Sequence, residues 1–411
     1  MASIVGIGLR LPGEPDNVTT PAQFVDFVTD KKSGIKPLPT GRFPPVWEAT
    51  VADMRFGALA GDSVWDCDGA AFGFSPVSMA HADPQLRLAL EVCIEALHDS
   101  GLSPADVQSG AASVGVFAAG GLPEHIARLA SGRGAFCKHT IVGNYGCYLS
   151  NFVSQIMNLK GPSLTLDTAC SSSLTALHVA MESLACGSCD AALVLGTNAL
   201  LSPHFLRALG ERGALSIAGN SVPFDAAADG FVRGEGAVAI VLVPNGRGGG
   251  TGAAPGGWRG ASRVYADVLV TGINHDGFKA SPGVPSAEAQ NCLIARTLAR
   301  VGVDPAHVAV MEAHATGTPT GDPIEASAVG ASLGAVPGRA RPLLISSVKG
   351  NFGHLESAAG LVSLAKVALG LYHGVALPMR FSGNVNRRIK LDRLNLELVT
   401  RLMPLEPAPG A

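Results

Sequence analysis

The sequence contains few charged and few aromatic residues. Asp, Glu, Lys and Arg make up 15% of its 411 residues, and Phe, Trp and Tyr make up 5%. The formal net charge is only −3, which gives no electrostatic reason to expect nucleic acid or an anionic membrane as a partner. No apolar run reaches the roughly 20 residues that a membrane-spanning helix needs. Since 47% of the residues are hydrophobic, we expect a compact soluble protein with one large core or two closely packed subdomains.

Cysteine is also sparse. The eight cysteines are scattered along the chain, which favours reduced thiols over a disulfide framework. The first residues lead directly into an apolar strand and leave no room for a signal peptide, so we expect a cytoplasmic protein. The segment from Cys186 to Cys189 is a lone CxxC without a second ligand pair, which we interpret as packing. We find no nucleotide-binding fingerprint and no metal-ligand cluster, and therefore expect no bound metal or cofactor.

Strands and helices alternate along the chain. We expect strands at residues 4–9, 113–117, 163–166, 191–195, 237–243, 263–271, 308–312 and 343–347, with one more possible at 396–400. We expect helices beginning at Pro84, with Asp83 as its cap, and just after Cys170, then at 288–301, 322–332 and 354–371. Residues 12 to about 74 read as irregular, and the Gly-rich residues 246–260 as a flexible surface loop.

The order of these elements repeats. Residues 1–250 and 251–411 show the same alternation, which predicts an α/β fold of two pseudo-duplicated halves whose sheets enclose helices. On this interpretation the second half lacks a closing pair of strands. The absent pair would leave a sheet edge with unpaired backbone groups.

Cys170 occupies a strand-to-helix turn. An apolar segment, Gly161 to Leu166, precedes the sequence Asp-Thr-Ala-Cys-Ser-Ser-Ser, and Leu174, Leu177, Met181 and Leu184 follow at helical spacing. Ala169 and Ser171 are small enough for a tight bend. A helix N-terminus should lower the pKa of the thiol, and its N–H groups suit an oxyanion. An isolated cysteine is more often a buried structural residue, but this turn and the two histidine motifs below favour a nucleophile.

Two histidines occupy matching places in the second half. His314 follows the strand at 308–312 and precedes a Gly-broken loop and a helix, and open α/β sheets place functional groups at such strand ends. His354 follows another strand and a Gly-containing loop at an expected helix N-terminus, which disfavours imidazolium. Thr316 and Thr318 offer hydroxyls to a passing polar chain. Either histidine alone would be read as structural, whereas two beside a comparably placed cysteine favour catalysis.

The residue types define a chemistry. A thiolate accepts an acyl group as a thioester. Two neutral imidazoles can polarise the carbonyl of a second thioester that carries a carboxylate, so that loss of CO₂ leaves a stabilised enolate which attacks the acylated cysteine. A Cys-His-Asn hydrolase would need an amide that orients one histidine, and no such motif stands out.

These motifs resemble the β-ketoacyl synthase domain of type I polyketide synthases and related fatty acid synthases, a branch of the thiolase-fold superfamily. The resemblance extends over nearly the whole chain. It includes the segments at residues 4–13, 83–88, 167–173, 223–225, 230–236, 274–277, 312–325 and 347–360.

The resemblance implies a role for each site residue. Cys170 would be the acyl-accepting nucleophile, and His314 and His354 would support decarboxylation and condensation. Lys349 would organise the site through ion pairs, and Thr316 and Thr318 would bind the phosphopantetheine arm of an acyl carrier protein. It also implies a layered α-β-α-β-α sandwich, a homodimer, no metal or diffusible cofactor, and an acyltransferase supplied from elsewhere.

The chain departs from the family pattern at three places. Ala315 stands where many members have Gly, and residues 276–283 are compressed. The sequence also stops before a Gly-Phe-Gly-Gly-Thr-Asn-Ala-His stretch that supplies an oxyanion-hole N–H and the last two strands. Because Cys170, His314 and His354 are all present, the expected function is nevertheless an active condensing enzyme. The alternative is a catalytically impaired fragment, or a partner subunit that shapes chain length. A biosynthetic thiolase fits the Cys170 and His354 motifs poorly.

Overall fold

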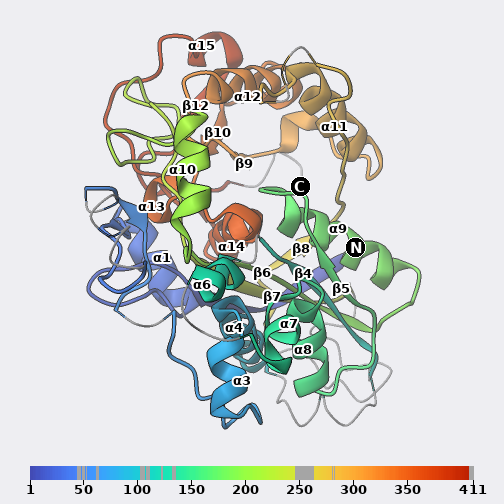
Figure 1. The fold of residues 1–411 in the computed structure, drawn as a ribbon. Coiled ribbons are helices and arrows are strands. Elements are labelled where there is room, and N and C mark those ends of the chain that lie inside the picture. The colour runs from blue at the N-terminus through green and yellow to red at the C-terminus, as the bar shows by residue number, and fades with distance from the viewer. Residues whose placement is uncertain are drawn as a thin grey trace.

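A computed structural model describes the chain except for residues 44–47, 49–50, 52, 62–63, 102–106, 108–111, 122–123, 132–135, 246–262, 280, 282 and 407–411. The loop expected at 246–260 lies outside the described residues. The described chain forms two principal sheets separated by a helical layer, with further helices on the outer faces (Figure 1). Within the described part of the chain, no helix combines the length and the apolarity needed to cross a bilayer.

The larger sheet is built mainly from the first half of the chain. Its six strands follow the order β5 (Ser163–Leu166), β4 (Val114–Ala119), β6 (Ala191–Asn198), β7 (Gly236–Pro244), β1 (Ala2–Arg10) and β8 (Ala266–Val268). β4 is parallel to β5 and β6, whereas β7 is antiparallel to β6 and β1. All strands expected here are present, although β8 is much shorter than the expected 263–271.

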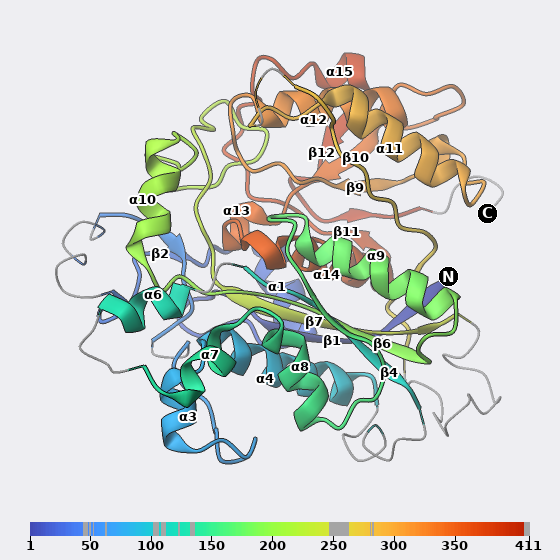
Figure 2. The ribbon, with the colours of Figure 1, turned by 45° about the vertical axis from the view of Figure 1, so that its right-hand side comes forward.

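Helices cover both faces of this sheet. α4 (Pro84–Asp99), α7 (Lys138–Asn144) and α8 (Tyr148–Ile156) lie on one face, and α9 (Ser172–Ala185) and α14 (Ala359–Tyr372) lie on the other (Figure 2). Each face has its own hydrophobic core, which explains why β1, β4, β6 and β7 are almost wholly apolar.

α4 packs directly against β1 because two glycines leave room for its backbone. A Cβ atom at Gly6 would lie 2.1 Å from the Ala96 carbonyl oxygen, and one at Gly8 would lie 2.0 Å from the Val92 carbonyl oxygen. The helix begins as the sequence predicts, since the Asp83 carboxylate accepts a hydrogen bond from the Gln85 N–H at 2.9 Å.

The smaller sheet belongs to the second half. Its parallel strands follow the order β12 (Leu396–Leu398), β10 (Leu343–Ser346) and β9 (Val310–Glu312). α11 (Ala287–Ala299) and α12 (Gly321–Val329) cover its outer face, and α14 lies between the two sheets (Figure 2). The result is the layered α-β-α-β-α sandwich that the resemblance implies.

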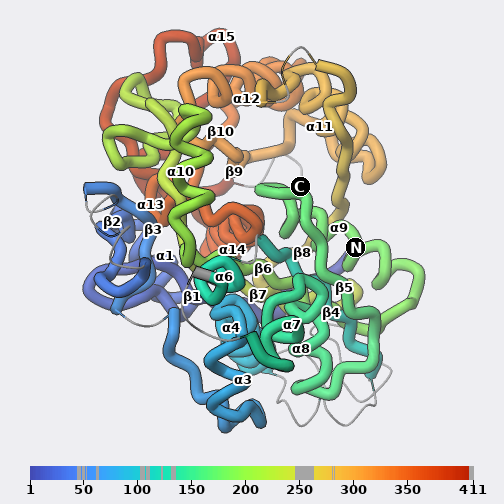
Figure 3. Tube along the Cα trace, viewed as in Figure 1, coloured from blue at the N-terminus to red at the C-terminus, as the bar shows by residue number. Residues whose placement is uncertain are grey.

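The N-terminal region contains a helix that the sequence analysis did not expect. α1 (Pro21–Thr29) lies within the stretch that we predicted to be irregular, and that prediction is wrong here. Thr20 and Gln23 form a capping box before an apolar face. The rings of Phe24 and Phe27 stack on Phe352 with centroids 5.5 and 5.2 Å apart. α1 therefore packs beside α13 (Lys349–Phe352), which lies more than 300 residues later in the chain (Figure 3).

The helix expected at 354–371 also begins later than predicted. Gly353 and Glu356 have positive φ values of 74° and 47°, which interrupt the helix, so α14 starts only at Ala359. The remaining elements are short: α3 (Pro76–His81), α6 (Glu124–Ser131), α10 (Pro203–Glu211), α15 (Leu391–Leu394), the 3-10 turns Pro305–His307 and Glu356–Ala358, a π-helical turn at Gly330–Gly334, and the strand pairs β2 (Ile35–Lys36) with β3 (Phe56–Gly57) and β11 (Val375–Ala376) with β13 (Met403–Pro404).

A buried ion pair connects α14 to the smaller sheet. The Lys366 ammonium lies 2.8 Å from a Glu312 carboxylate oxygen and 2.8 Å from the Ser346 hydroxyl oxygen. Both charged side chains are at most 4% exposed. Burial lowers the pKa of Lys366, and Glu312 opposes that shift.

Replacing Lys366 with methionine should therefore destabilise the fold strongly. The substitution removes the ammonium that pairs with the buried Glu312, which should lower the free energy of unfolding by about 3–5 kcal/mol. The exposed pair Arg341–Glu406 provides the control, since Arg341→Met should change the free energy of unfolding by less than about 1 kcal/mol. Urea denaturation measures both values, and equal losses in the two variants would contradict this account.

Candidate functional site

Cys170 lies at a sharp bend between β5 and α9. Ala169 adopts a left-handed conformation with φ of 56°, and the Ser172 hydroxyl closes the turn by accepting the Thr168 N–H at 2.7 Å and donating to the Ala169 carbonyl at 2.6 Å. The N–H groups of Ser171 and Ser172 donate to backbone carbonyls within the same turn. These two N–H groups are therefore engaged within the turn, and the prediction that N–H groups of this helix end hold an oxyanion stays a prediction.

The electrostatics of Cys170 also differ from the expectation. Burial raises the pKa of its thiol, while the Lys349 ammonium and the Cys170 N–H lower it and Glu356 raises it further. The net shift is upward, because desolvation of the thiolate outweighs the helix end and the nearby cation. The resting side chain is therefore a thiol, and acting as a nucleophile would require it to lose a proton.

His314 lies two residues after β9 on a loop fixed by α12. The Glu325 carboxylate accepts the N–H groups of His314 and Ala315, each at 2.7 Å. The surrounding protein and then the Lys349 ammonium lower the pKa of His314 to about 3. One side of His314 is open to solvent, which limits the desolvation, but the direction alone makes the imidazole neutral at pH 7.

His354 is buried, and its tautomer follows from its hydrogen bond. Its Nδ1 accepts the Glu356 N–H at 3.1 Å, so the ring proton of the neutral form resides on Nε2. Burial first, and then Lys349, His314 and Arg233, lower the pKa of His354 well below its usual range. The predicted neutral state agrees with this direction, although burial and nearby cations replace the expected helix N-terminus as its cause.

The fold brings these three side chains together from distant parts of the sequence. The Cys170 Sγ and a ring nitrogen of each histidine all lie within 4.8 Å of one another. The imidazole centroids are 5.3 Å apart, and the rings are nearly perpendicular at 83°. The arrangement places one thiol beside two neutral imidazoles, which suits covalent acyl transfer with stabilisation of a developing oxyanion.

Lys349 contributes charge to this cluster. It is the first residue of α13 and is 2% exposed. Burial lowers its pKa, whereas Glu325 and Glu312 raise it most among the nearby groups. Its ammonium in turn lowers the pKa of Cys170, His314 and His354.

The same donor set of one sulfur and two imidazole nitrogens is one that Zn²⁺ accepts. The electrostatics oppose such use, because the thiol has a raised pKa and a buried ammonium acts on all three groups. A cation in this position repels a dication. We therefore interpret the cluster as a covalent catalytic site.

Thr316 and Thr318 follow His314 on the same loop. Their hydroxyl oxygens are 3.4 Å apart, and the Thr318 hydroxyl also accepts the Gly321 N–H at 3.2 Å. The Asp322 carboxylate holds the loop by accepting the N–H groups of Gly317 and Thr318 at 3.1 and 3.3 Å. Burial raises the pKa of Asp322 to about 6.

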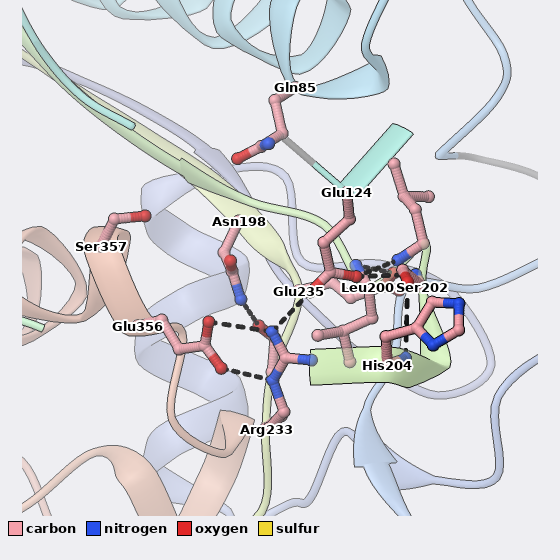
Figure 4. Close-up of polar contacts among 12 residues, drawn as sticks. Gln85, Glu124, Asn198, Leu200, Ser202, His204, Arg233, Glu235, Glu356 and Ser357 are labelled. Carbon is pink, nitrogen blue, oxygen red and sulfur yellow. Dashed lines mark hydrogen bonds and ion pairs between the residues drawn. The ribbon is translucent and has the colours of Figure 1, made fainter. Parts of the chain in front are cut away.

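The sequence analysis missed the residues that support the site. Asp322 and Glu325 lie inside a motif that we quoted, but their backbone contacts were not predicted. The cluster of Arg233, Glu356 and Glu124 was also missed, because it joins residues 109 and 123 positions apart (Figure 4). The available signal was that Arg233, Glu356 and Glu124 are charged residues of opposite sign in otherwise apolar segments. Ala315, which stands where many family members have Gly, has a positive φ of 21°.

Comparison with known proteins gives a consistent result. Residues 2–246 match the family described as Beta-ketoacyl synthase, N-terminal domain, and residues 265–381 match Beta-ketoacyl synthase, C-terminal domain. A phenolphthiocerol/phthiocerol polyketide synthase of Mycobacterium tuberculosis is 36% identical over 404 residues, which are 97% of this chain and 21% of that protein. Polyketide synthase GfsA of Streptomyces halstedii is 37% identical over 414 residues, covering 99% of this chain and 5% of that protein. The chain thus spans about a fifth or less of the length of these two relatives.

Solved structures agree with the fold. The ketosynthase from module 6 of the bacillaene synthase of Bacillus subtilis 168 superposes with a TM-score of 0.86 at 29% identity, covering 99% of this chain and 67% of that one. The oxazolomycin ketosynthase domain OzmH KS7 of Streptomyces albus JA3453 gives a TM-score of 0.84 at 30% identity, covering 99% and 71%. Both similarities extend over both sheets of the described sandwich, and the expected thiolase-like fold is confirmed.

Proposed function

Because the chain belongs to the β-ketoacyl synthase family, we propose that it catalyses a decarboxylative Claisen condensation in polyketide biosynthesis. The electrophile is an acyl group held on Cys170, and the nucleophile comes from a malonyl-type thioester on an acyl carrier protein. The observation that carries the proposal is the grouping of the Cys170 thiol with two neutral imidazoles within 4.8 Å. The polyketide setting follows from the two relatives, both of which are polyketide synthases.

The reaction proceeds in two stages. The Cys170 sulfur first attacks an acyl thioester, its C–S bond to the carrier arm breaks, and the carrier thiol leaves with the proton. The malonyl thioester then loses CO₂, and the electron pair of the broken C–C bond forms an enolate whose oxygen accepts the His354 Nε2–H. The carbanion attacks the acyl carbonyl, a C–C bond forms, and the Cys170 thiolate departs.

The other site residues have proposed roles in the same scheme. Lys349 supplies a fixed positive charge beside the reacting groups. Thr316 and Thr318 bind the phosphopantetheine arm, which belongs to the carried substrate and not to a resident cofactor. The halves at 1–250 and 251–411 contribute the cysteine and both histidines, respectively.

We also propose the partners. The acyl carrier protein presents both substrates, and the acyltransferase that loads it is supplied elsewhere. A second copy of the chain pairs along β5, which is an edge strand among the described residues and leaves Leu164 45% exposed. The eight cysteines, all free thiols, are consistent with a cytoplasmic location.

Product analysis tests the proposed function. The protein is incubated with an acyl thioester and with malonyl groups on either carrier protein or coenzyme A, and mass spectrometry follows the products. We expect a β-ketoacyl carrier thioester and CO₂ from the carrier-bound substrate. Condensation of two coenzyme A esters without CO₂ release would instead identify a thiolase. Efficient acylation without condensation would favour a role in shaping chain length beside an active partner.

The lowered histidine pKa values predict the pH dependence of decarboxylation. Both imidazoles stay neutral well below pH 6.5, so between pH 7.5 and 5.5 the rate should not fall through histidine protonation. For an ordinary histidine with a pKa of about 6.5, the neutral fraction would fall about tenfold over this pH range. CO₂ release by the Cys170→Ala variant measures this without a titrating thiol. A rate that falls with a midpoint near pH 6.5 would show that the site leaves the histidines unperturbed.

A further inference from the structure

The backbone around His354 is clamped to the segment that precedes β7. The His354 N–H donates to the Val232 carbonyl at 2.7 Å, and the Gly234 N–H donates to the His354 carbonyl at 2.8 Å. The backbone of His354 is thus hydrogen-bonded to Val232 and Gly234, the residues before and after Arg233. The rings of His354 and Phe231 meet edge to face with centroids 5.1 Å apart. These contacts hold the main chain, but none of them determines which ring nitrogen carries the proton.

The Arg233 side chain then reaches the residue that does determine it. Its Nε and Nη2 donate to the two carboxylate oxygens of Glu356, the second at 3.0 Å, in a two-pronged ion pair (Figure 4). Glu356 is the residue whose N–H donates to His354 Nδ1. The Arg233 side chain therefore binds Glu356, the residue whose N–H sets the His354 tautomer.

Glu356 needs to be held. Its φ of 47° is left-handed, a conformation that costs a non-glycine residue roughly 1 kcal/mol or more. In this conformation its N–H lies 3.1 Å from His354 Nδ1. An ion pair on its carboxylate offsets the strain and keeps the N–H aimed at the ring.

Arg233 is itself rigidly placed. It is 2% exposed, and its Nη2 also donates to Glu124 at 2.9 Å. The second Glu124 oxygen accepts the N–H groups of Leu201 and Ser202 at 2.8 and 2.7 Å. Although burial lowers the pKa of Arg233, Glu356 and Glu124 raise it more, so the guanidinium stays charged.

We propose that Arg233 is a positioning residue for the condensation: through Glu356 it holds His354 as the Nε2–H tautomer facing Cys170 and His314. It touches no substrate and acts only through the Glu356 N–H. The proposal rests on the proposed function for its catalytic consequence, whereas the tautomer can be observed without any turnover. Lysine cannot replace the arginine, because a single ammonium does not grip both carboxylate oxygens of Glu356 while also reaching Glu124.

The first test is the tautomer itself. Protein labelled with ¹⁵N-histidine is examined by two-bond ¹H–¹⁵N correlation, with His354→Asn used to assign the ring. We expect a single Nε2–H signature in the unmodified protein and a mixture of tautomers in Arg233→Lys. Glu356→Gln, which keeps the side-chain shape but loses the charge, should also give a mixture and serves if Arg233→Lys does not fold.

The second test is kinetic. Arg233→Lys should lower malonyl decarboxylation by about ten- to a hundredfold, the scale of a misplaced catalytic group, while acylation of Cys170 changes much less. Arg42→Lys is the matched control, since Arg42 is also 2% exposed and pairs with the buried Glu235 without contacting His354. It should leave the tautomer and the ratio of the two rates unchanged.

Two results would overturn the proposal: a pure Nε2–H signature in both folded site variants, or equal changes in Arg233→Lys and Arg42→Lys. The failure of the proposed function looks different. In that case the tautomer shifts as predicted, but neither the unmodified protein nor any variant releases CO₂ from the malonyl carrier thioester.

Discussion

Cys170→Ala should abolish condensation while the protein still decarboxylates malonyl carrier thioester. In the proposed mechanism the thiol is the acyl acceptor, so its loss should reduce product formation by at least about a thousandfold, as for other covalent nucleophiles. Decarboxylation needs the two imidazoles and not the sulfur, and a side chain smaller than Cys leaves their environment open. The measurements are product formation by mass spectrometry and CO₂ release in the same samples.

The control for this prediction is the exposed thiol of Cys186. Cys186 is exposed, and a hydrogen bond with the Ser188 side chain is the main cause that lowers its pKa, so this thiol is accessible to incidental acylation. Cys186→Ala should condense at the unmodified rate. If Cys170→Ala still formed product, or if it lost decarboxylation to the same degree as condensation, Cys170 would not have the role of acyl acceptor alone.

Replacement of either histidine should have the second large effect, on the other half-reaction. His354→Ala removes the Nε2–H donor and His314→Ala removes its neutral neighbour, and loss of one oxyanion donor costs about a hundred- to a thousandfold. Decarboxylation should fall by this factor, whereas transfer of an acyl group onto Cys170 should fall much less. The rate of CO₂ release measures decarboxylation, and intact-mass spectrometry separately measures acylation of Cys170.

His125 provides the matched control. Like His354 it is buried, and burial lowers its pKa to about 4, but its Nε2 lies 3.4 Å from the Ala80 carbonyl oxygen and its ring lies beside Trp65. His125→Ala tests whether losing any buried neutral histidine is sufficient to reduce activity. Equal losses of both half-reactions in His314→Ala, His354→Ala and His125→Ala would mean that these effects arise from damage to the fold.

The sequence was sufficient to single out the three side chains that the fold brings together, Cys170, His314 and His354, because their signals are local. The small residues around Cys170 mark a sharp turn between a strand and a helix, and His314 follows a strand at a sheet edge. Such patterns depend on neighbours within a few positions. The alternation of strands and helices likewise predicted two halves whose sheets enclose helices, whereas the full α-β-α-β-α layering was implied by the family resemblance.

Features that depend on distant contacts were not predictable. Desolvation raises the pKa of Cys170 because residues from both halves surround it, whereas the local pattern showed only a helix N-terminus. The late start of α14 depends on the strained Glu356, whose partner Arg233 lies 123 residues earlier. α1 was missed for a different reason: its capping box was visible in the sequence, but the surrounding prolines and glycines obscured the short apolar face.

The central claim is that an acyl group on Cys170 is the electrophile of the condensation. The most direct measurement acylates the folded protein with an N-acetylcysteamine thioester, removes the reagent, and adds malonyl carrier protein while intact mass is followed. The account predicts a single adduct on Cys170 that disappears on addition of the malonyl carrier, with a matching β-ketoacyl carrier product. An adduct that persists, or a folded protein that never acquires one at Cys170, would contradict it.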